Sequence, residues 1–237
     1  MAEVNSLIKL TGTIDGITFY YLNGKLVARK SGGGFTRQRI KNDASMQRTR
    51  ENSAEFGNCS RANKLFRHGV RQMLGYHRFK YWHSPLMKLF NDLKKLDTQS
   101  DRGERQVAIG VQDPEAYRLF ADFKYTPQCS IQEILGVQPT YANGEFKLGK
   151  VHLHKDLPPD RLIYLEAGLL RLDFAADTSQ LLLADPFIIK PDSPSQHRNL
   201  APTDISFELP IVFLHLTTSQ HQPYFDERLV GFEVLRV

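Results

Sequence analysis

A succession of short apolar runs after residue 105 limits the fold of this chain more than any other feature. Runs such as "RLIYLEAGLLRLDF" and "ISFELPIVFLHLTTS" are separated by clusters of proline, glycine, asparagine and aspartate, at the spacing typical of antiparallel strands. No segment between them is long enough for the crossover helix that parallel strands need, which disfavours Rossmann-like folds. We therefore predict an antiparallel β-sandwich at residues 106–237, with both faces of its long strands covered and a short helix at residues 113–115.

A second signal lies near the N-terminus, where two β-rich segments meet at Asn23-Gly24. This dipeptide readily supplies the two positive φ angles of a type I′ turn, so residues 16–30 are predicted to form a β-hairpin. Residues 7–14 add a candidate third strand. Because an isolated hairpin is only marginally stable in water, we expect this one to pack against a neighbouring element or another subunit. Three consecutive glycines at residues 32–34 then predict a flexible joint.

Helical periodicity begins near Asn42 or Asp43, either of which can cap a helix, and no proline interrupts it before Pro85. At 100° per residue, one face of this first helix is apolar and the opposite face is basic. Ser84 and Pro85 favour the start of a second helix, which we expect to run antiparallel to the first. The predicted apolar face of the first helix comprises Phe56, Cys59, Ala62, Phe66, Val70 and Met73.

The two halves of the chain carry opposite net charge. Residues 1–105 contain 20 lysines and arginines and 9 aspartates and glutamates, a net charge of +11, whereas residues 106–237 contain 11 and 17, a net charge of −6. We predict an α+β protein with a basic module of hairpin and two helices at residues 1–105 and a β-sandwich domain at residues 106–237. A basic half of this kind suggests an anionic partner, or docking onto the acidic half of a second copy.

Basic and aromatic side chains are interleaved between the two predicted helices. The sequence "YHRFKYWH" at residues 76–83 can stack unpaired bases while contacting phosphates, and the outer face of the first helix is basic. No helix-turn-helix, RNP or zinc signature accompanies them. The candidate nucleic-acid-binding residues are Arg61, Lys64, Arg67, Arg71, Arg78, Lys80, Tyr81 and Trp82.

Self-assembly is the leading interpretation of the N-terminal module, and nucleic-acid binding within a mobile element or nucleoprotein is the alternative. An exposed hairpin, a glycine joint and a charged helix are parts with which one subunit can clasp another in a homo-oligomer. Three charged residues of the first helix continue the face that is apolar farther along, so they either enter solvent or contact a polar surface. We predict an ion-pair row at the edge of such a contact, facing the hairpin or a second copy. The candidate interface residues are Tyr20, Arg29, Arg48, Glu51 and Glu55.

The sequence contains no catalytic signature. His152 and His154 stand two residues apart, which on a strand would place both on one face with Asp156, but no third ligand follows at a diagnostic spacing. We interpret Cys59 and Cys129 as buried small hydrophobic residues. We therefore predict a protein that is not an enzyme and that holds no metal and no cofactor. Without a secretory signal or a run of about twenty apolar residues, we expect a cytoplasmic protein with no membrane partner.

The stretches "LTGTIDGITFYYLNGKLVARKSGG", "RIKNDASMQRTRENSAEFG" and "SRANKLFR" resemble the N-terminal part of an uncharacterised family of bacterial proteins of similar length. In that family a glycine-rich hairpin precedes an Arg-Thr-Arg-Glu-Asn…Glu-Phe-Gly helix, and a β-rich C-terminal half follows. The resemblance is specific as far as residue 105 and brings no activity with it. It implies that the charged segment belongs to a recurrent module with a defined contact. The matching residues are Gly12, Phe19, Tyr20, Arg29, Arg39, Asn42, Asp43, Arg48, Thr49, Arg50, Glu51, Asn52, Glu55, Phe56, Gly57, Lys64, Arg102 and Gly103.

Overall fold

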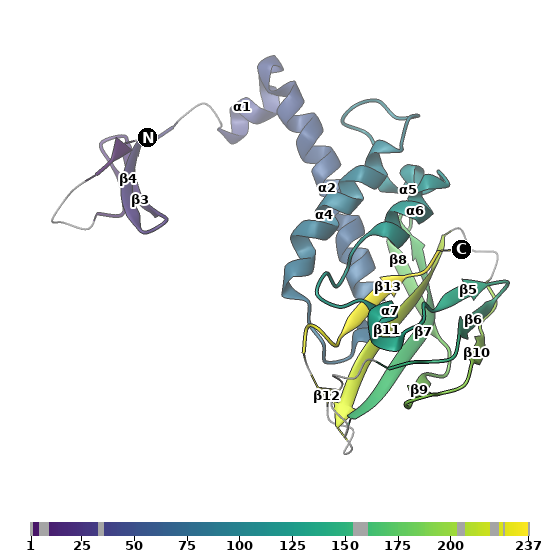
Figure 1. Ribbon diagram of the computed structural model, residues 1–237. Helices are drawn as coiled ribbons and strands as arrows, with labels where there is room; N and C mark the ends of the chain where they lie inside the picture. The colour runs from purple at the N-terminus through teal and green to yellow at the C-terminus, as the bar shows by residue number, and fades with distance from the viewer. Residues whose placement is uncertain are drawn as a thin grey trace. The chain divides into compact units, whose positions relative to one another are not determined.

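The structure is a computed structural model that describes residues 2–4, 10–32, 36–153, 161–202, 207–218, 223–224 and 226–236 (Figure 1). The chain forms two compact units, Met1–Ser53 and Ala54–Val237. The boundary between them falls within helix α2 (Gln47–Gly69). Helices and antiparallel sheets are both present, so the predicted α+β class is confirmed.

The first unit begins with a sheet of short antiparallel strands, which we call the N-terminal sheet. Asn23 and Gly24 join two of its strands with φ angles of 51° and 79°, which confirms the predicted hairpin turn. Residues 12–14 form the predicted third strand, whereas the strand at residues 2–3 was not predicted. Residues 33–35 of the predicted glycine joint lie outside the described residues. The strands, in the spatial order β1-β4-β3-β2, are β1 (Ala2–Glu3), β2 (Gly12–Ile14), β3 (Ile17–Leu22) and β4 (Lys25–Lys30).

A short helix that was not predicted, α1 (Arg37–Asn42), follows the N-terminal sheet. Thr36 caps it, because its hydroxyl accepts a hydrogen bond from the backbone amide of Arg39 at 3.2 Å. The apolar residue Ile40 is half-buried, and no residue of this helix is fully buried. Local capping, rather than an apolar stripe, therefore defines the helix.

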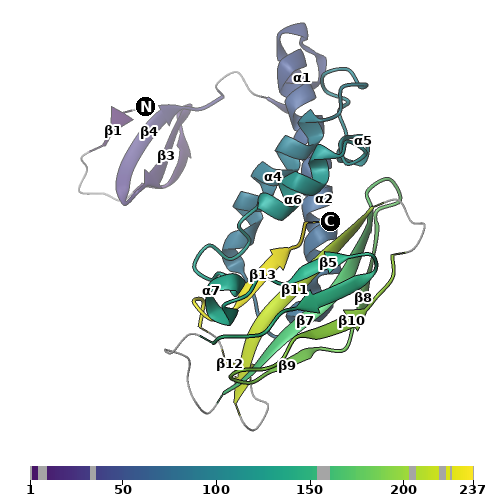
Figure 2. The same cartoon turned by 45° about the vertical axis from the view of Figure 1, so that its right-hand side comes forward.

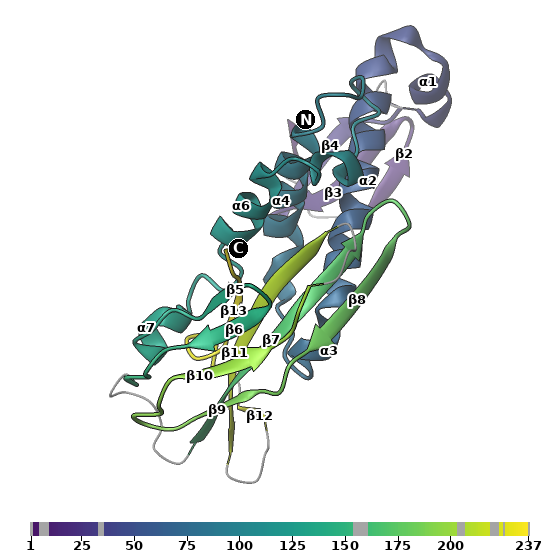
Figure 3. The same ribbon diagram turned by 90° about the vertical axis from the view of Figure 1, so that its right-hand side faces the viewer.

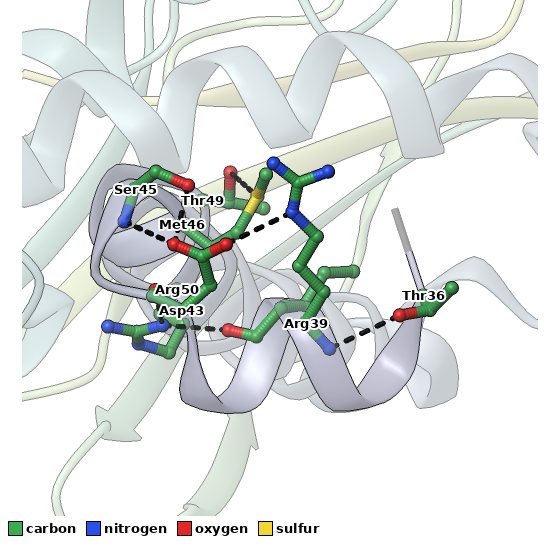
Figure 4. A network of polar contacts seen from close by, with 8 residues as sticks. Thr36, Arg39, Asp43, Ser45, Met46, Thr49 and Arg50 are labelled. Atoms are coloured by element: carbon green, nitrogen blue, oxygen red, sulfur yellow. Dashed lines mark hydrogen bonds and ion pairs between the residues drawn. The ribbon is translucent and has the colours of Figure 1, made fainter. Parts of the chain in front are cut away.

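Asp43 organises the turn between α1 and α2 (Figure 4). Its carboxylate accepts a hydrogen bond from the backbone amide of Ser45 at 2.8 Å and so caps the 3₁₀ turn η1 (Ala44–Met46), which confirms the predicted cap. Arg50 donates to the backbone carbonyls of Ile40 and Asp43 at 2.8 and 2.9 Å. Part of the dense charge in this segment therefore serves to hold the segment's own backbone.

In the second unit, α2 and α4 (His83–Lys95) pack side by side and antiparallel, as predicted. Both helices contribute buried residues to one apolar cluster. As the residue numbers of the contacting residues increase along α2, those of their partners on α4 decrease. This order shows that the two helices run antiparallel. The contacting pairs are Glu55 with Lys94, Cys59 with Phe90, and Asn63 with His83.

The buried face of α2 includes the predicted residues Cys59, Ala62 and Phe66. Phe56 was also predicted there, and that prediction is wrong because 61% of this residue is exposed. The buried arc is centred on Glu55 and Phe66, and Phe56 lies about 100° from Glu55 because it is the next residue on the helix. The charged residue Glu55 therefore occupies the interior position, and the aromatic residue lies outside it.

Two antiparallel sheets make up the β-rich part of the second unit. The larger sheet is built on two long strands, β7 (Arg161–Asp173) and β11 (Glu208–Thr218), which pair between residues 161–171 and 208–218. Strands β8 (Thr178–Leu183) and β9 (Phe187–Ile189) pair with β7, while β12 (Pro223–Tyr224) and β13 (Gly231–Val234) pair with β11. The smaller sheet has the order β10-β6-β5, from β5 (Thr140–Ala142), β6 (Glu145–Leu148) and β10 (Gln196–Asn199).

Both faces of the larger sheet are covered, as the sequence predicted (Figures 2 and 3). Along β11, Leu209, Ile211 and Phe213 point into the cluster shared with α2 and α4, whereas Val212 and Leu214 point toward the smaller sheet. The first cluster joins residues from both sides of position 105. The predicted domain boundary at residues 105 and 106 is therefore not a break in this core, and the structure divides after Ser53 instead.

Residues 106–139 were assigned to the sandwich, but strands begin only at Thr140 and the preceding segment carries short helices. Ser130 caps the last of these helices by accepting a hydrogen bond from the Glu133 amide at 3.3 Å, and Gly136 ends it with a φ angle of 68°. The helix predicted at residues 113–115 marks the start of a longer one. The helices are α5 (Val107–Gly110), α6 (Glu115–Asp122) and α7 (Ile131–Leu135).

The loop between α4 and α5 is organised around the buried carboxylate of Asp97, which is 1% exposed. One of its oxygens accepts hydrogen bonds from the amides of Gln99 and Ser100 at 3.1 and 2.9 Å, and the other accepts from the amide of Gln106 at 2.9 Å. Burial alone would raise the pKa of Asp97, but these amide hydrogen bonds outweigh it and hold the pKa below its ordinary value of 3.8.

Because the folded-state pKa of Asp97 is depressed, its contribution to stability is complete above pH 3.8 and is lost as the pH falls through the lower folded value. We expect Asp97→Asn to lower the free energy of unfolding at neutral pH by about 2 kcal/mol, since a neutral amide is a weaker acceptor. The deficit should shrink in acid. Urea unfolding at several pH values measures it, with Asp101→Asn in the exposed part of the same loop as the control. A deficit that is independent of pH would contradict the role of the charge.

Candidate functional site

A hollow with a volume of about 400 Å³ opens between the end of α2, the short helix α3 (Arg71–Leu74) and the segment that precedes α4. It brings together five cationic side chains that the sequence predicted as nucleic-acid ligands. Their backbone positions span residues 64–80, so the chain reverses direction around them. We call this hollow the basic groove. Its lining residues are Lys64, Arg67, His68, Arg71, Leu74, His77, Arg78, Phe79, Lys80 and Trp82.

The orientation of Arg67 is set by a buried amide. Asn63, which is fully buried, accepts a hydrogen bond from Nε of Arg67 at 2.8 Å and donates from Nδ2 to the backbone carbonyl of His83 at 3.0 Å. This leaves the two terminal nitrogens of the Arg67 guanidinium as further donors. Arg78 folds back onto the loop and donates to the backbone carbonyls of Gly75 and His77.

The charge of the basic groove is of one sign. Among the described residues, no aspartate or glutamate lines it, and its lysines and arginines form no ion pair with any carboxylate in the described ranges. His77 adds no positive charge at neutral pH, because burial, together with the neighbouring His215 and Arg78, lowers its pKa to about 4. The net field comes from the five lysine and arginine side chains, all of them exposed.

The predicted aromatic ligands divide into two classes. Trp82 is 3% exposed, its Nε1 donates to the backbone carbonyl of Tyr125 at 2.8 Å, and its ring stacks on Phe79 at a centroid distance of 4.6 Å. Trp82 therefore forms part of the floor of the groove and has no free face for a base. Tyr81 is 39% exposed but does not line the groove, and Tyr76, 85% exposed, follows Gly75 at the tip of the loop.

The basic groove continues into a second hollow of about 350 Å³ that shares His68 and Arg71 with it and reaches strand β8. Arg61 lies on the same exposed side of α2 but lines neither hollow. The sequence analysis did not name His68, Leu74, His77 and Phe79 as individual site residues. The signal for His77 and Phe79 was present, because both belong to the aromatic and basic run at residues 76–83.

A separate surface belongs to the N-terminal sheet, whose strand register sorts its side chains onto two faces. One face carries polar contacts: Thr13 with Thr18 at 2.9 Å, Lys25 with Glu3, and Arg29 over the ring of Tyr20 at 5.6 Å. The other face, which we call the apolar face, has one charged residue at its margin among the described residues of the sheet, Lys30. The apolar face consists of Ile14, Ile17, Phe19, Tyr21, Leu26 and Ala28.

The apolar face is only partly covered within its own unit. Leu26, near the hairpin turn, is 8% exposed, but Ile14, Ile17 and Tyr21 are 49%, 43% and 44% exposed. Isolated sheets of short strands need an apolar layer on at least one face for stability. Tyr20 and Arg29, which were predicted at an interface, lie on the opposite, polar face and contact each other.

The predicted row of Arg48, Glu51 and Glu55 is not continuous. Arg48 pairs with Glu51 at 3.0 Å, as predicted. Glu55 instead points into the core of the second unit, where it pairs with Lys94 of α4 at 2.5 Å and accepts a hydrogen bond from the amide of Gly103 at 2.8 Å. Burial alone would raise the pKa of Glu55, but the bonds from Lys94 and Gly103 hold it below its ordinary value.

The metal ligands considered from the sequence form no site in the part of the chain that the structure describes. His152 follows β6 outside any strand, so the predicted alternation with His154 does not apply, and His154 and Asp156 lie outside the described residues. Within the described ranges, no three histidine, cysteine, aspartate or glutamate side chains form a group able to hold a metal ion. Burial raises the pKa of the thiol of Cys129 to about 12, which keeps it protonated and unreactive.

No protein-family model matches this chain, and no curated protein or solved structure matches it either. The resemblance of the N-terminal residues to a bacterial family therefore stays an expectation. None of the helices in the described part of the chain combines the length and apolarity of a membrane-spanning segment.

Proposed function

We propose that the protein is a non-enzymatic structural or assembly protein that self-associates through its N-terminal module. The apolar face of the N-terminal sheet carries this proposal. A sheet with one polar and one apolar face is stable only when a second layer covers the apolar face. In the N-terminal sheet, three large apolar side chains of that face are more than two-fifths exposed.

The shape of the sheet favours packing by the face over pairing by the edge. Its outer strands β1 and β2 are two and three residues long, and strands this short offer few free backbone groups for another chain. A second copy can cover an apolar face by a twofold arrangement in which each face buries the other. We therefore propose a second copy of the chain as the partner.

The proposal places the protein in the cytoplasm. Cys59 and Cys129 are both free and buried, as is usual for proteins of reducing compartments, where structural disulfides are rare. Neither thiol takes part in the proposed association.

The test compares two neighbouring residues of β3 that have nearly equal exposure and lie on opposite faces of the sheet. Tyr21 lies on the apolar face and is 44% exposed, whereas Leu22 lies on the polar face and is 46% exposed. We expect Tyr21→Thr to weaken self-association at least about tenfold, because a lost apolar side chain contributes about 1.5 kcal/mol and 1.4 kcal/mol is a factor of ten. Threonine preserves the strand propensity.

Sedimentation velocity over a range of protein concentrations measures the association, and Leu22→Thr is the matched control. We expect the parent and the Leu22→Thr variant to associate alike. A parent protein that stays monomeric at all concentrations, or an equal weakening by Leu22→Thr, would show that the apolar face is not the contact.

A further inference from the structure

We propose that the basic groove binds single-stranded nucleic acid, with the phosphates held by its five lysine and arginine side chains and an unpaired base placed against Phe79, the half-buried aromatic side chain of its lining. This inference goes beyond self-association and rests on a different part of the chain. The observations that carry it are the single sign of the charge, the fixed orientation of Arg67, the aromatic floor and the size of the hollow.

The positive charge of the groove favours an anionic ligand. Five cationic side chains surround one hollow, and no carboxylate among the described residues lies on its wall. Some surface cations elsewhere in the second unit pair with carboxylates, as Lys95 does with Asp92 and Arg118 does with Glu115, but no such pair within the described residues neutralises the groove. Like charges that converge on one hollow create a positive potential there, which attracts a polyanion.

Part of the site is oriented before any ligand arrives. The buried amide of Asn63 fixes the guanidinium of Arg67 from one side, which leaves its terminal nitrogens as a fork for phosphate oxygens. Arg78 is likewise held by backbone carbonyls of its own loop. Lys64, Arg71 and Lys80 have no such restraint from a described residue, so these three can move onto successive phosphates.

The form of the hollow favours a single strand over a duplex. A volume of about 400 Å³ suits a group the size of one nucleotide, and pockets of this size enclose small ligands. The floor is aromatic, since the half-buried Phe79 lines the groove and stacks on the buried Trp82. Unpaired bases stack on such side chains, whereas the bases of a duplex are already stacked on one another.

The neighbouring hollow can hold the next part of the bound nucleic-acid strand. It shares His68 and Arg71 with the basic groove and adds Ser179 and Leu181 of β8. A nucleic-acid strand bound at Lys80 can therefore extend past Arg71 and across β8. Because none of these contacts reads a base edge, we expect little dependence on sequence.

The experiment measures binding of a fluorescent oligonucleotide, single-stranded or annealed to its complement, by the full chain at several salt concentrations. Five phosphate contacts predict a slope of about −3.5 for log K against log[salt], so the affinity for the single strand should fall about 100-fold between about 50 and about 200 mM salt. The variant Lys64→Gln/Arg71→Gln/Lys80→Gln should reduce the slope to about −1.4 and the loss to about sevenfold. Arg67 and Arg78 are kept because their hydrogen bonds support the local fold.

The matched control, Arg61→Gln/Lys88→Gln/Lys150→Gln, removes the same charge from exposed positions outside the groove, and its slope should equal that of the parent. Thermal melts check that both variants fold. Equal weakening by the two triple variants would show that net charge, not the groove, attracts nucleic acid. Absence of binding by the parent at low salt would overturn the proposal and point to an acidic protein surface. Binding of the duplex as tight as that of the single strand would overturn the assignment of the ligand.

Discussion

Replacing Glu55 with alanine should lower the free energy of unfolding of the second unit by about 3–5 kcal/mol, which is the usual cost of removing one partner from a buried ion pair. The side chains of Glu55 and Lys94 are 8% and 9% exposed and lie 2.5 Å apart. Without the carboxylate, the ammonium of Lys94 remains buried without a counter-charge. The amide of Gly103 also loses its acceptor, which releases the loop that follows α4.

Urea unfolding measures the loss, with Glu104→Ala in the exposed part of the same loop as the control, which should stay within about 0.5 kcal/mol of the parent. A double variant, Glu55→Leu/Lys94→Met, should recover much of the stability because it buries two apolar side chains in place of two charges. If Glu55→Ala and Glu104→Ala unfold alike, the buried pair contributes nothing to the stability of the unit.

A second large effect is expected where α5 crosses the end of α4. A Cβ atom added at Gly110 would lie 2.1 Å from the backbone carbonyl oxygen of Leu93. Backbone atoms cannot move aside as a side chain can, so Gly110→Ala must push the two helices apart. We expect the free energy of unfolding to fall by about 3 kcal/mol, at the upper end of the range for overpacked interiors.

Gly57→Ala is the matched control for this substitution. Gly57 lies inside α2, and a Cβ atom there would meet no atom within 4 Å. Alanine is the better helix former by about 0.8–1.0 kcal/mol, so this variant should be slightly more stable than the parent. Thermal melts of the two variants should therefore shift in opposite directions. Shifts of the same sign and size would mean that the close approach at Gly110 is not a constraint.

The features that were predicted correctly from the sequence are those with a strong local cause. Asn23-Gly24 gave the hairpin because few dipeptides accept two positive φ angles, and the cap at Asp43 follows from the short reach of its side chain. The same signal stands at Asn143-Gly144, with φ angles of 52° and 77° between β5 and β6, and it was overlooked inside a longer strand-like run.

The features that were missed depend on distant parts of the chain. Trp82 was a reasonable stacking residue in an aromatic and basic run, but contacts with Tyr125 and Phe232 bury it, and no local pattern announces partners so far along the chain. Glu55 was placed correctly on the continuation of the apolar face. Its partner Lys94 lies 39 residues away in the sequence. The helical periodicity of α2 alone therefore could not distinguish an internal ion pair from a contact with another molecule.

The candidate site was predictable in part. The cationic residues of the basic groove were identified from their spacing on the helix and from the run that follows. Arg61 shares that spacing, yet it stays outside the groove because the loop at residues 75–82 folds back beside Lys64 and Arg67 and not beside Arg61. Residues 107–135 were misassigned because helices of four to eight residues lack the length for a clear apolar period.

Because of its position, Trp82 is also an intrinsic fluorescence probe of the second unit. It is the only tryptophan of the chain, it lies in the second unit, and its ring is packed between Phe79 and Phe232. Its emission will therefore move to longer wavelength when the second unit unfolds, while the N-terminal sheet, whose aromatic side chains are phenylalanine and tyrosine, is silent at that wavelength. Tryptophan fluorescence can thus follow the unfolding of the second unit alone. Quenching of this fluorescence by a bound nucleic-acid strand would report binding at the floor of the groove.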